Sequence, residues 1–514
     1  MSRLENTTKN FIWSTVSTMA SSILGFISRT AFIYFIGTHY LGVNSLFTEL
    51  LSMLSLAELG LGVAINFSLY KPLSQNNIEE VKSLMMLYKK AYRIIGLIIA
   101  VVGISLTPFL NYLIKGGQDI PNIKLIYLVF LFNTSYSYLF SYKRTLLSAD
   151  QKSYLMTNID MIISICTLLL QIIFLFIFKN YYVYLAVNVI VGISQNFYVN
   201  SYINRRYPYL LEKNVEPLSK ENKDTIVKNV KAMILHKLGD LCINQTDNII
   251  ISSFISIQLV GLVSNYNLII NMINKFCMNL FNAANASLGN LIATENNKKR
   301  YEVFKGYNFM AFWIFGWCAI CFAVLLNPFI TLWIGKENTI NQSIIILVII
   351  NFYLVGMRIP VANVKAAAGL YVQDQFVPII QSVVNLVISV IGAKTLGLTG
   401  VYLGTVISSL VLPCWYRPIL IYKYIFDESP KSYFKKYIIY IFVILINYFL
   451  VDLIVKTFIG MNITFITLIQ RGIICLVIPN VIIYMLFRKS EDFKYIISII
   501  NRIKSHFLER RRVS

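Results

Sequence analysis

The sequence predicts an all-α, polytopic membrane protein with about fourteen transmembrane helices, arranged as two pseudo-repeated six-helix bundles and two extra C-terminal helices. The first observation behind this prediction is the composition. Of 514 residues, 57% are hydrophobic and only 14% are charged, whereas soluble domains hold about 25% charged residues. So few charged side chains cannot cover the surfaces of soluble domains of this total length. A soluble protein is therefore excluded.

The second observation is a series of long apolar runs separated by short polar loops. One bilayer crossing takes about 20 apolar residues. The runs are continuous rather than alternating, so they predict helices and not strands. We place the helices at residues 11–37, 42–70, 86–110, 121–147, 154–178, 181–203, 230–256, 259–290, 305–334, 340–364, 376–395, 398–424, 434–459 and 463–487.

The third observation is the uneven distribution of basic residues. With the N-terminus in the cytosol, 35 of the 46 lysines and arginines fall on the cytosolic side, six on the external side and five within helices. This asymmetry follows the positive-inside rule, so it supports the helix count and places both termini in the cytosol. It also explains the net charge of +22 without a nucleic-acid partner, because the basic residues are scattered through short loops. We expect no cleavable signal peptide, since the first apolar run is too long.

An internal repeat relates the two halves of the chain. A shift of 219 residues places Gly42 on Gly261, and a shift of 220 places Pro108 on Pro328. Parallel repeats of this kind occur in transporters. The predicted organisation is an N-terminal six-helix bundle at 1–203, a cytosolic linker at 204–229, a second six-helix bundle at 230–424, two additional transmembrane helices at 425–488 and a basic cytosolic tail at 489–514. The tail is either an amphipathic helix on anionic lipid or a solvated segment.

No catalytic motif is visible in the sequence. There is no glycine-rich loop ahead of a lysine, no His/Cys metal cluster and no nucleophile motif. The seven cysteines all fall within apolar runs, so we expect neither disulfides nor a zinc site. We therefore expect no enzyme activity, no cofactor and no metal. Transport energy would come from an ion gradient or from the gradient of the substrate itself.

Polar residues inside the predicted helices gather on single helical faces. Ionisable groups in a membrane usually face a cavity or a partner, so these stripes predict a large hydrated cavity. The alternative is that the charges pair internally to hold helices together, or reach the interface. The stripes comprise Ser14, Ser17, Ser21, Gly25, Ser28 and Arg29; Asp160, Ser164, Thr167 and Gln171; His236, Lys237, Asp240, Asn244 and Asp247; Asn267, Asn271, Asn274, Lys275, Asn282 and Asn285; and Asn351, Arg358 and Lys365.

Two acidic residues of the second helix, Glu49 and Glu58, need separate treatment. Nine residues at 100° each place them on opposite sides of the helix. They cannot act as a paired acid and base. Glu58 shares the phase of Asn44, Gly62 and Asn66, so we favour Glu58 over Glu49 as a cavity residue.

Several segments resemble bacterial polysaccharide-repeat flippases. The resemblance spans most of residues 5–425 and rests on the order of its motifs. These are the run at 40–62, Gly-Met-Arg-Ile-Pro at 356–360, Ala-Gly-Leu-Tyr at 368–371, Gly-Leu-Thr-Gly-Val-Tyr-Leu-Gly-Thr at 397–405, Tyr-Arg-Pro at 416–418 and Tyr-Lys at 422–423. Such flippases (Wzx-type lipid-linked oligosaccharide flippases) form the polysaccharide transporter family of the MOP exporter superfamily.

The resemblance implies two bundles that alternate access around a central cavity in a bacterial plasma membrane. The substrate would be a polyprenyl-diphosphate-linked oligosaccharide, moved from the inner to the outer leaflet. Cations in the cavity would bind the diphosphate, and these are Arg29, Lys237, Lys275 and Arg358. Side-chain amides would bind the glycan, and these are Asn271 and Asn274. Coupling to protons or sodium would use Glu58, Asp240 and Asp247. The implied partners are membrane lipids and, functionally, a polysaccharide polymerase and glycosyltransferases; a monomer suffices.

Two other functions stay open. A lipid II flippase of peptidoglycan synthesis would share the architecture and the anionic cargo. A cation-coupled multidrug exporter usually has twelve helices and should favour acidic and aromatic residues for cationic drugs. The extra basic groups of this chain favour an anionic cargo.

Overall fold

The structure, a computed structural model, forms helices and turns throughout its described part, with no strand there. Clustering of contacts divides the chain into two units, Met1–Ser264 and Asn265–Ser514. The described residues are 3–55, 61–116, 120–212, 215–218, 226, 245–282, 285–370 and 372–498.

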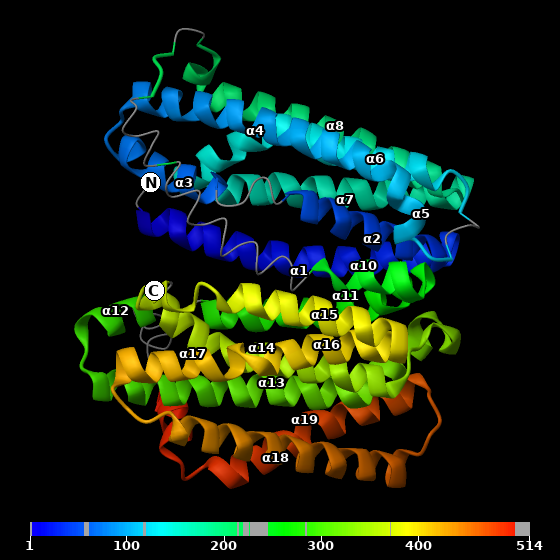
Figure 1. The fold of residues 1–514 in the computed structure, drawn as a ribbon, viewed down its shortest axis with the longest axis vertical. Coiled ribbons are helices and arrows are strands. Elements are labelled where there is room, and N and C mark those ends of the chain that lie inside the picture. Colours follow the sequence, from blue (N-terminus) through cyan, green and yellow to red (C-terminus); the bar gives the residue numbers. More distant parts are fainter. Residues whose placement is uncertain are drawn as a thin grey trace, which may run out of the picture. The chain divides into compact units, whose positions relative to one another are not determined.

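The first unit is built from long helices (Figure 1). Side-chain caps fix where some of them begin: Asn77 accepts a hydrogen bond from the backbone N–H of Glu80 at the start of α4. The helices are α1 (Arg3–Ile36), α2 (His39–Leu54), α3 (Leu61–Ser74), α4 (Ile78–Leu106), α5 (Leu110–Leu113), α6 (Ile123–Ala149), α7 (Ser153–Phe178), α8 (Tyr181–Arg206), α10 (Asp247–Ile250), the π-helix η4 (Ile251–Ile255) and the first turns of α11 (Ile257–Asn282).

Backbone hydrogen bonds join the loop after α5 to η4 and to the first residue of α11. The Lys115 N–H donates to the Ser252 carbonyl (2.9 Å), and the Ile257 N–H donates to the Lys115 carbonyl (3.0 Å). The Lys115 side chain adds a hydrogen bond to the Phe254 carbonyl (3.0 Å). These bonds satisfy polar backbone groups that a helix end would otherwise leave open.

The second unit holds the rest of α11 and the helices that follow it (Figure 1). Asn296 caps α13, which begins well before the apolar run predicted at 305–334 because its first turns are polar. The helices are α12 (Asn285–Thr294), α13 (Asn297–Ile334), α14 (Gln342–Ala367), α15 (Val377–Leu396), α16 (Leu398–Val411), α17 (Pro413–Ile421), the π-helix η7 (Tyr422–Phe426), α18 (Lys431–Ile454), the π-helix η8 (Val455–Ile459) and α19 (Phe465–Phe487).

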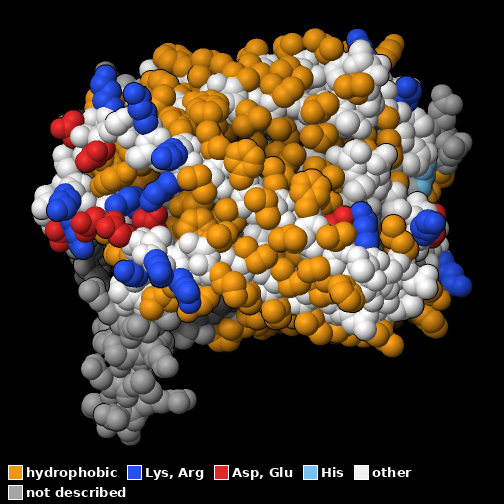
Figure 2. Space-filling model, turned by 90° about the horizontal axis from the view of Figure 1, so that it is seen from below, with side chains coloured by type: hydrophobic (Ala, Val, Ile, Leu, Met, Phe, Trp, Pro, Cys, Tyr) orange, Lys and Arg blue, Asp and Glu red, His pale blue; other side chains and the backbone are white. Residues whose placement is uncertain are grey.

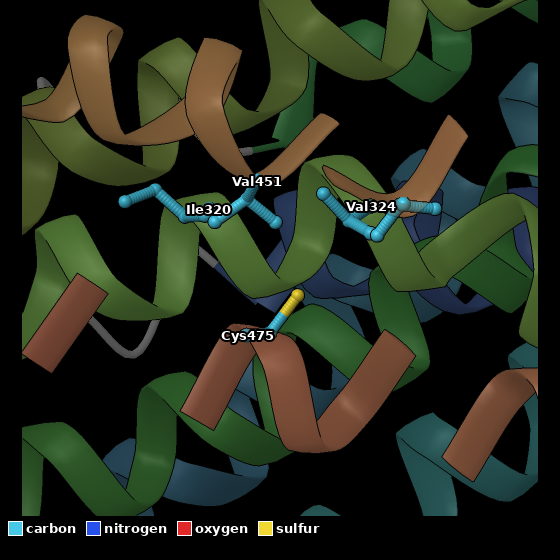
Figure 3. Close-up of a cluster of buried hydrophobic side chains, with 5 residues drawn as sticks. Ile320, Val324, Val451 and Cys475 are labelled. Atoms are coloured by element: carbon cyan, nitrogen blue, oxygen red, sulfur yellow. The ribbon is translucent and has the colours of Figure 1, made fainter. Parts of the chain in front are cut away.

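The two extra helices α18 and α19 pack on α13. A buried cluster joins them, made of Ile320 and Val324 from α13, Val451 from α18 and Cys475 from α19, with Val455 beside them (Figure 3). The Trp317 indole N–H also donates to the Cys475 carbonyl at 2.9 Å. Lipid tails are as apolar as these side chains, so close van der Waals packing and the Trp317 hydrogen bond hold this corner together.

Apolar side chains cover the outer face of α18 and α19. Figure 2, seen from their side of the molecule, shows a broad apolar middle, with Lys, Arg, Asp and Glu mostly toward the ends. Exposed members are Phe442, Phe449, Leu453, Ile466, Ile473 and Leu476. Eleven helices within the described residues are long and apolar enough to cross a bilayer. The all-helical, multi-pass membrane fold is confirmed.

Some of the predicted helices are described only in part, and one contains a break. The range 42–70 is described as α2 and α3, and most of 230–256 lies outside the described residues. α11 is not among the eleven helices, and its asparagines lower its mean hydropathy. The predicted span at 398–424 is present as one candidate span, Leu398–Phe426, but its helix is interrupted at Leu412 because Pro413 lacks the N–H needed to continue it and starts α17.

At the C-terminus, Phe493 and Ile496 are buried in the second unit (5% and 8% exposed). The Phe493 ring lies 5.6 Å from that of Trp313. The described start of the tail therefore packs on protein; residues 499–514 lie outside the description.

Candidate functional site

Arg29 lies in a polar network within the first unit. Its Nη1 donates to the Ser264 hydroxyl at 2.7 Å, which joins α1 to the start of α11. Next to it, the Ser28 hydroxyl donates to Gln171 Oε1 (3.4 Å), and the Gln171 amide donates to Asn188 Oδ1 (2.7 Å). The predicted polar faces of α1 and α7 thus meet each other and α8.

A second polar group of the first unit contains two carboxylates. Glu49 of α2 accepts a hydrogen bond from the Asn248 side-chain amide at 2.5 Å. The charge of Asp247, at the start of α10, also acts on Glu49. Two carboxylates that interact in a poorly hydrated place favour a state in which they share a proton or a cation. Asp247 is one of the residues predicted for ion coupling, whereas Glu49 is not.

Asp160 is neutralised inside the first unit. Both of its carboxylate oxygens accept from Arg144 Nη1 at 3.0 Å, and Oδ1 also accepts from the Gln195 amide at 2.8 Å. The charge on Asp160 therefore helps to hold α6, α7 and α8 together. This is the alternative interpretation of the polar stripes, in which intramembrane charges pair internally.

In the second unit, α11 presents Asn271, Asn274 and Lys275. Asn271 and Lys275 are exposed and Asn274 is half-buried. Neither a hydrogen bond nor an ion pair joins these three side chains to another described residue. They are available to a ligand.

The predicted stripe of α14 faces α16 and α17. The Ser409 hydroxyl donates to Asn351 Oδ1 (3.1 Å). Lys365 Nζ lies 2.5 Å from Asp374 Oδ2, and Arg417 Nε lies 3.0 Å from the same oxygen. Asp374 is 1% exposed and was not predicted, because a loop acid carries no helical phase that would reveal its partners.

Arg358, between these two partnered residues, differs from them. It is half-buried, and it forms no ion pair or hydrogen bond with any other residue in the described part of the chain. Its electrostatic neighbours are Cys414, Arg417, Tyr433 and Tyr437. Arg358 thus lies close to α17 and α18.

Three predicted site residues, Lys237, Asp240 and Glu58, lie outside the described residues. Of the others, Arg29 and Asp247 belong to the first unit, whereas Asn271, Asn274, Lys275 and Arg358 belong to the second. Their roles stay predictions.

No family model matches the chain. No curated protein matches it either. Several solved structures match the chain. A structure described as "Lipid II flippase MurJ, inward closed conformation" matches with a TM-score of 0.63 and 15% identity, over 93% of this chain and 99% of that chain. A point mutant of the Vibrio cholerae MATE transporter VcmN matches with a TM-score of 0.58 and 14% identity, over 83% of this chain and 98% of that chain.

A third structure, an inward-facing "multidrug resistance MATE family transporter of the MOP superfamily", matches with a TM-score of 0.55 and 16% identity, over 76% of this chain and 92% of that chain. This chain has the fold of these transporter structures. That fold confirms the predicted all-helical membrane fold class, and the matched structures are described as a flippase and as transporters. At identities this low the match concerns the fold, so the polysaccharide branch stays a prediction.

Proposed function

We propose that this MOP-fold protein is a flippase for a polyprenyl-diphosphate-linked oligosaccharide repeat unit. It moves this lipid from the inner to the outer leaflet of a bacterial plasma membrane by alternating access, for cell-surface polysaccharide biosynthesis. Both termini face the cytosol in this proposal. A polysaccharide polymerase and glycosyltransferases act on the same pathway.

The observation that carries the proposal is how far the match to the lipid II flippase extends. The part of this chain outside that match is shorter than α18 and α19 together, so the match includes residues of these helices. The two MATE matches leave 17% and 24% of this chain uncovered although they use nearly all of their own chains. This difference favours a lipid-linked cargo over a multidrug exporter.

The charge of the interior also supports an anionic cargo. Arg29, Lys275 and Arg358 are cations within helices that are predicted to span the membrane. Arg29 donates to a serine hydroxyl, and no described carboxylate binds Lys275 or Arg358. Arginine suits a diphosphate because its planar guanidinium donates two parallel hydrogen bonds. The proposed cargo-binding residues are Arg29, Lys237, Lys275, Arg358, Asn271 and Asn274.

The glycan needs hydrogen-bond partners for its hydroxyls while it crosses the membrane. Each hydroxyl moved into hydrocarbon without a hydrogen-bond partner costs several kcal/mol. The asparagines of α11 can replace those bonds while the polyprenyl tail stays in lipid.

We assign ion coupling to acidic residues, namely Asp247, Asp240 and Glu58. We add Glu49 to this group because it accepts a hydrogen bond from Asn248 and interacts electrostatically with Asp247. A proton or a sodium ion shared by Glu49 and Asp247 would reduce their repulsion.

Depletion of the protein in its host tests the class of cargo. The proposal expects loss of the surface polymer with an intact cell wall. Lysis with unchanged surface polymer would indicate lipid II instead. Increased sensitivity to cationic drugs alone would indicate a multidrug exporter.

A further inference from the structure

The corner of the second unit around Arg358 is rich in positive charge. Arg358, Lys365 and Arg417 contribute three cations. Lys365 and Arg417 both bind the carboxylate of Asp374, which is therefore occupied. Arginine does not lose its proton in proteins, so burial cannot neutralise Arg358.

Two buried hydroxyls in this part of the second unit have no hydrogen-bond partner in the described part of the chain. They are the phenol oxygens of Tyr353, on α14, and Tyr437, on α18. Tyr353 is only 7% exposed. The two rings are neighbours, with centroids 6.3 Å apart, and Tyr437 interacts electrostatically with both Tyr353 and Arg358. A buried hydroxyl without a partner costs about 1–3 kcal/mol in a folded protein, so both hydroxyls are suited to donate to a ligand.

The hydroxyl groups and the cation are held by packed neighbours. Leu354, one turn from Arg358 on α14, packs with Val406 and Cys414, and Tyr437 lies against this cluster. Tyr433 lies near Tyr437, with ring centroids 5.9 Å apart. α14, α17 and α18 therefore fix the positions of the donors before any ligand arrives.

We propose that Arg358, Tyr353 and Tyr437 form a binding site for a phosphate-type anion, completed by α18. A guanidinium and phenol hydroxyls are all hydrogen-bond donors, and phosphate oxygens accept such bonds strongly. α18 lies outside the six-helix repeat, so the site adds a specific role for one of the extra helices. It deepens the proposed function, since a flippase for a diphosphate lipid would meet such a group, but its chemistry depends only on the second unit.

The source of the phosphate is either a lipid headgroup or free phosphate. Tyr437 lies in the second turn of α18, close to the basic residues Lys431, Lys435 and Lys436. Basic segments of this kind attract anionic lipid headgroups. The same donors would bind inorganic phosphate, so the test has two arms.

The first arm uses the full-length protein in phosphatidylcholine nanodiscs and titrates inorganic phosphate by calorimetry. The second arm uses nanodiscs that contain phosphatidic acid and counts retained lipids by native mass spectrometry. In whichever arm binding occurs, R358Q should weaken it by about tenfold or more, because it removes a charge-assisted donor. Y437F, which keeps the ring and removes only the hydroxyl, should weaken it by about threefold to tenfold.

The control is Y448F, a tyrosine of the same helix that packs with the cluster on α13 instead. It should bind as the wild type does. If neither ligand binds, or if R358Q and Y437F bind as tightly as Y448F, the anion site is wrong. Should R358Q fail to fold, Y437F alone decides. The readout is binding and not transport, so a chain that moves another cargo would still show this site.

Discussion

Gly42 and Gly261, which the internal repeat places at equivalent positions, lie against each other in the first unit. A Cβ added at Gly261 would lie 2.5 Å from the Thr38 carbonyl oxygen and 3.0 Å from the Gly42 nitrogen. A Cβ at Gly42 would overlap the Ile257 carbonyl oxygen. Two helix backbones approach this closely only where both residues lack side chains.

Replacing Gly261 with alanine should therefore destabilise the protein. Overpacking of this kind costs about 1–3 kcal/mol, and the nearest atoms are backbone atoms that cannot turn away. Gly25→Ala is the matched control, because a Cβ at that helical position meets nothing within 4 Å. Thermal unfolding in detergent should show a lower Tm for Gly261→Ala and an equal or higher Tm for Gly25→Ala. Equal values for the two variants would contradict the close contact.

Replacing Asp374 with asparagine should destabilise the second unit. The change leaves Lys365 and Arg417 without their shared counterion, and breaking a buried ion pair costs about 3–5 kcal/mol. The control is Asp452→Asn, whose partner Lys456 is 54% exposed, and exposed pairs contribute about 0–1 kcal/mol. Unfolding by denaturant in mixed micelles measures both. A loss no greater than that of the control would show that Asp374 does not hold the loop to α17.

Glu49→Gln should uncouple transport from the ion gradient. Glutamine keeps an oxygen that accepts from the Asn248 amide but can neither take up a proton nor bind a cation by charge. In proteoliposomes, we expect cargo flux that no longer responds to an imposed proton or sodium gradient, with passive exchange retained. Glu79→Gln is the control, because Glu79 is an exposed carboxylate that forms an ion pair with Lys82. Gradient dependence like that of the wild type would remove Glu49 from coupling.

Arg358→Ala should impair transport without impairing membrane insertion. A charge-assisted hydrogen bond contributes about 1.5–3 kcal/mol, which corresponds to roughly a tenfold to hundredfold loss of flux. Arg471→Ala makes an informative comparison because that intramembrane arginine donates to the Gly460 carbonyl at 2.9 Å. Its loss should lower the Tm while each folded molecule keeps its flux. Full activity of Arg358→Ala would take Arg358 out of the site.

Helical periodicity and composition were sufficient to predict the fold class, because a bilayer forces long apolar helices. They also singled out Arg358 within a polar stripe. The partners of that stripe could not be predicted, since helical phase shows which residues share a face but not which helix packs on it. Asp374 lies in a short 3-10 helix, Val372–Asp374, between two of the predicted membrane helices, and Tyr437 belongs to a helix outside the predicted repeat.

The neighbours of Glu49 show the same limit. The sequence allows its helical phase to be compared with that of Glu58 on the same predicted helix, while Asp247 and Asn248 come from a segment far along the chain. Pro413, by contrast, is a visible signal for the helix break within the span at 398–424, which the structure keeps as one candidate span.

The central claim is that the cargo is a lipid-linked repeat unit, and mass spectrometry of polyprenyl-linked glycans from depleted cells tests it most directly. The account predicts that one complete polyprenyl-diphosphate-linked repeat unit accumulates while the surface polymer disappears, which would also identify the sugar. Unchanged lipid-linked glycans, together with greater sensitivity to cationic drugs, would contradict the account and favour a multidrug exporter.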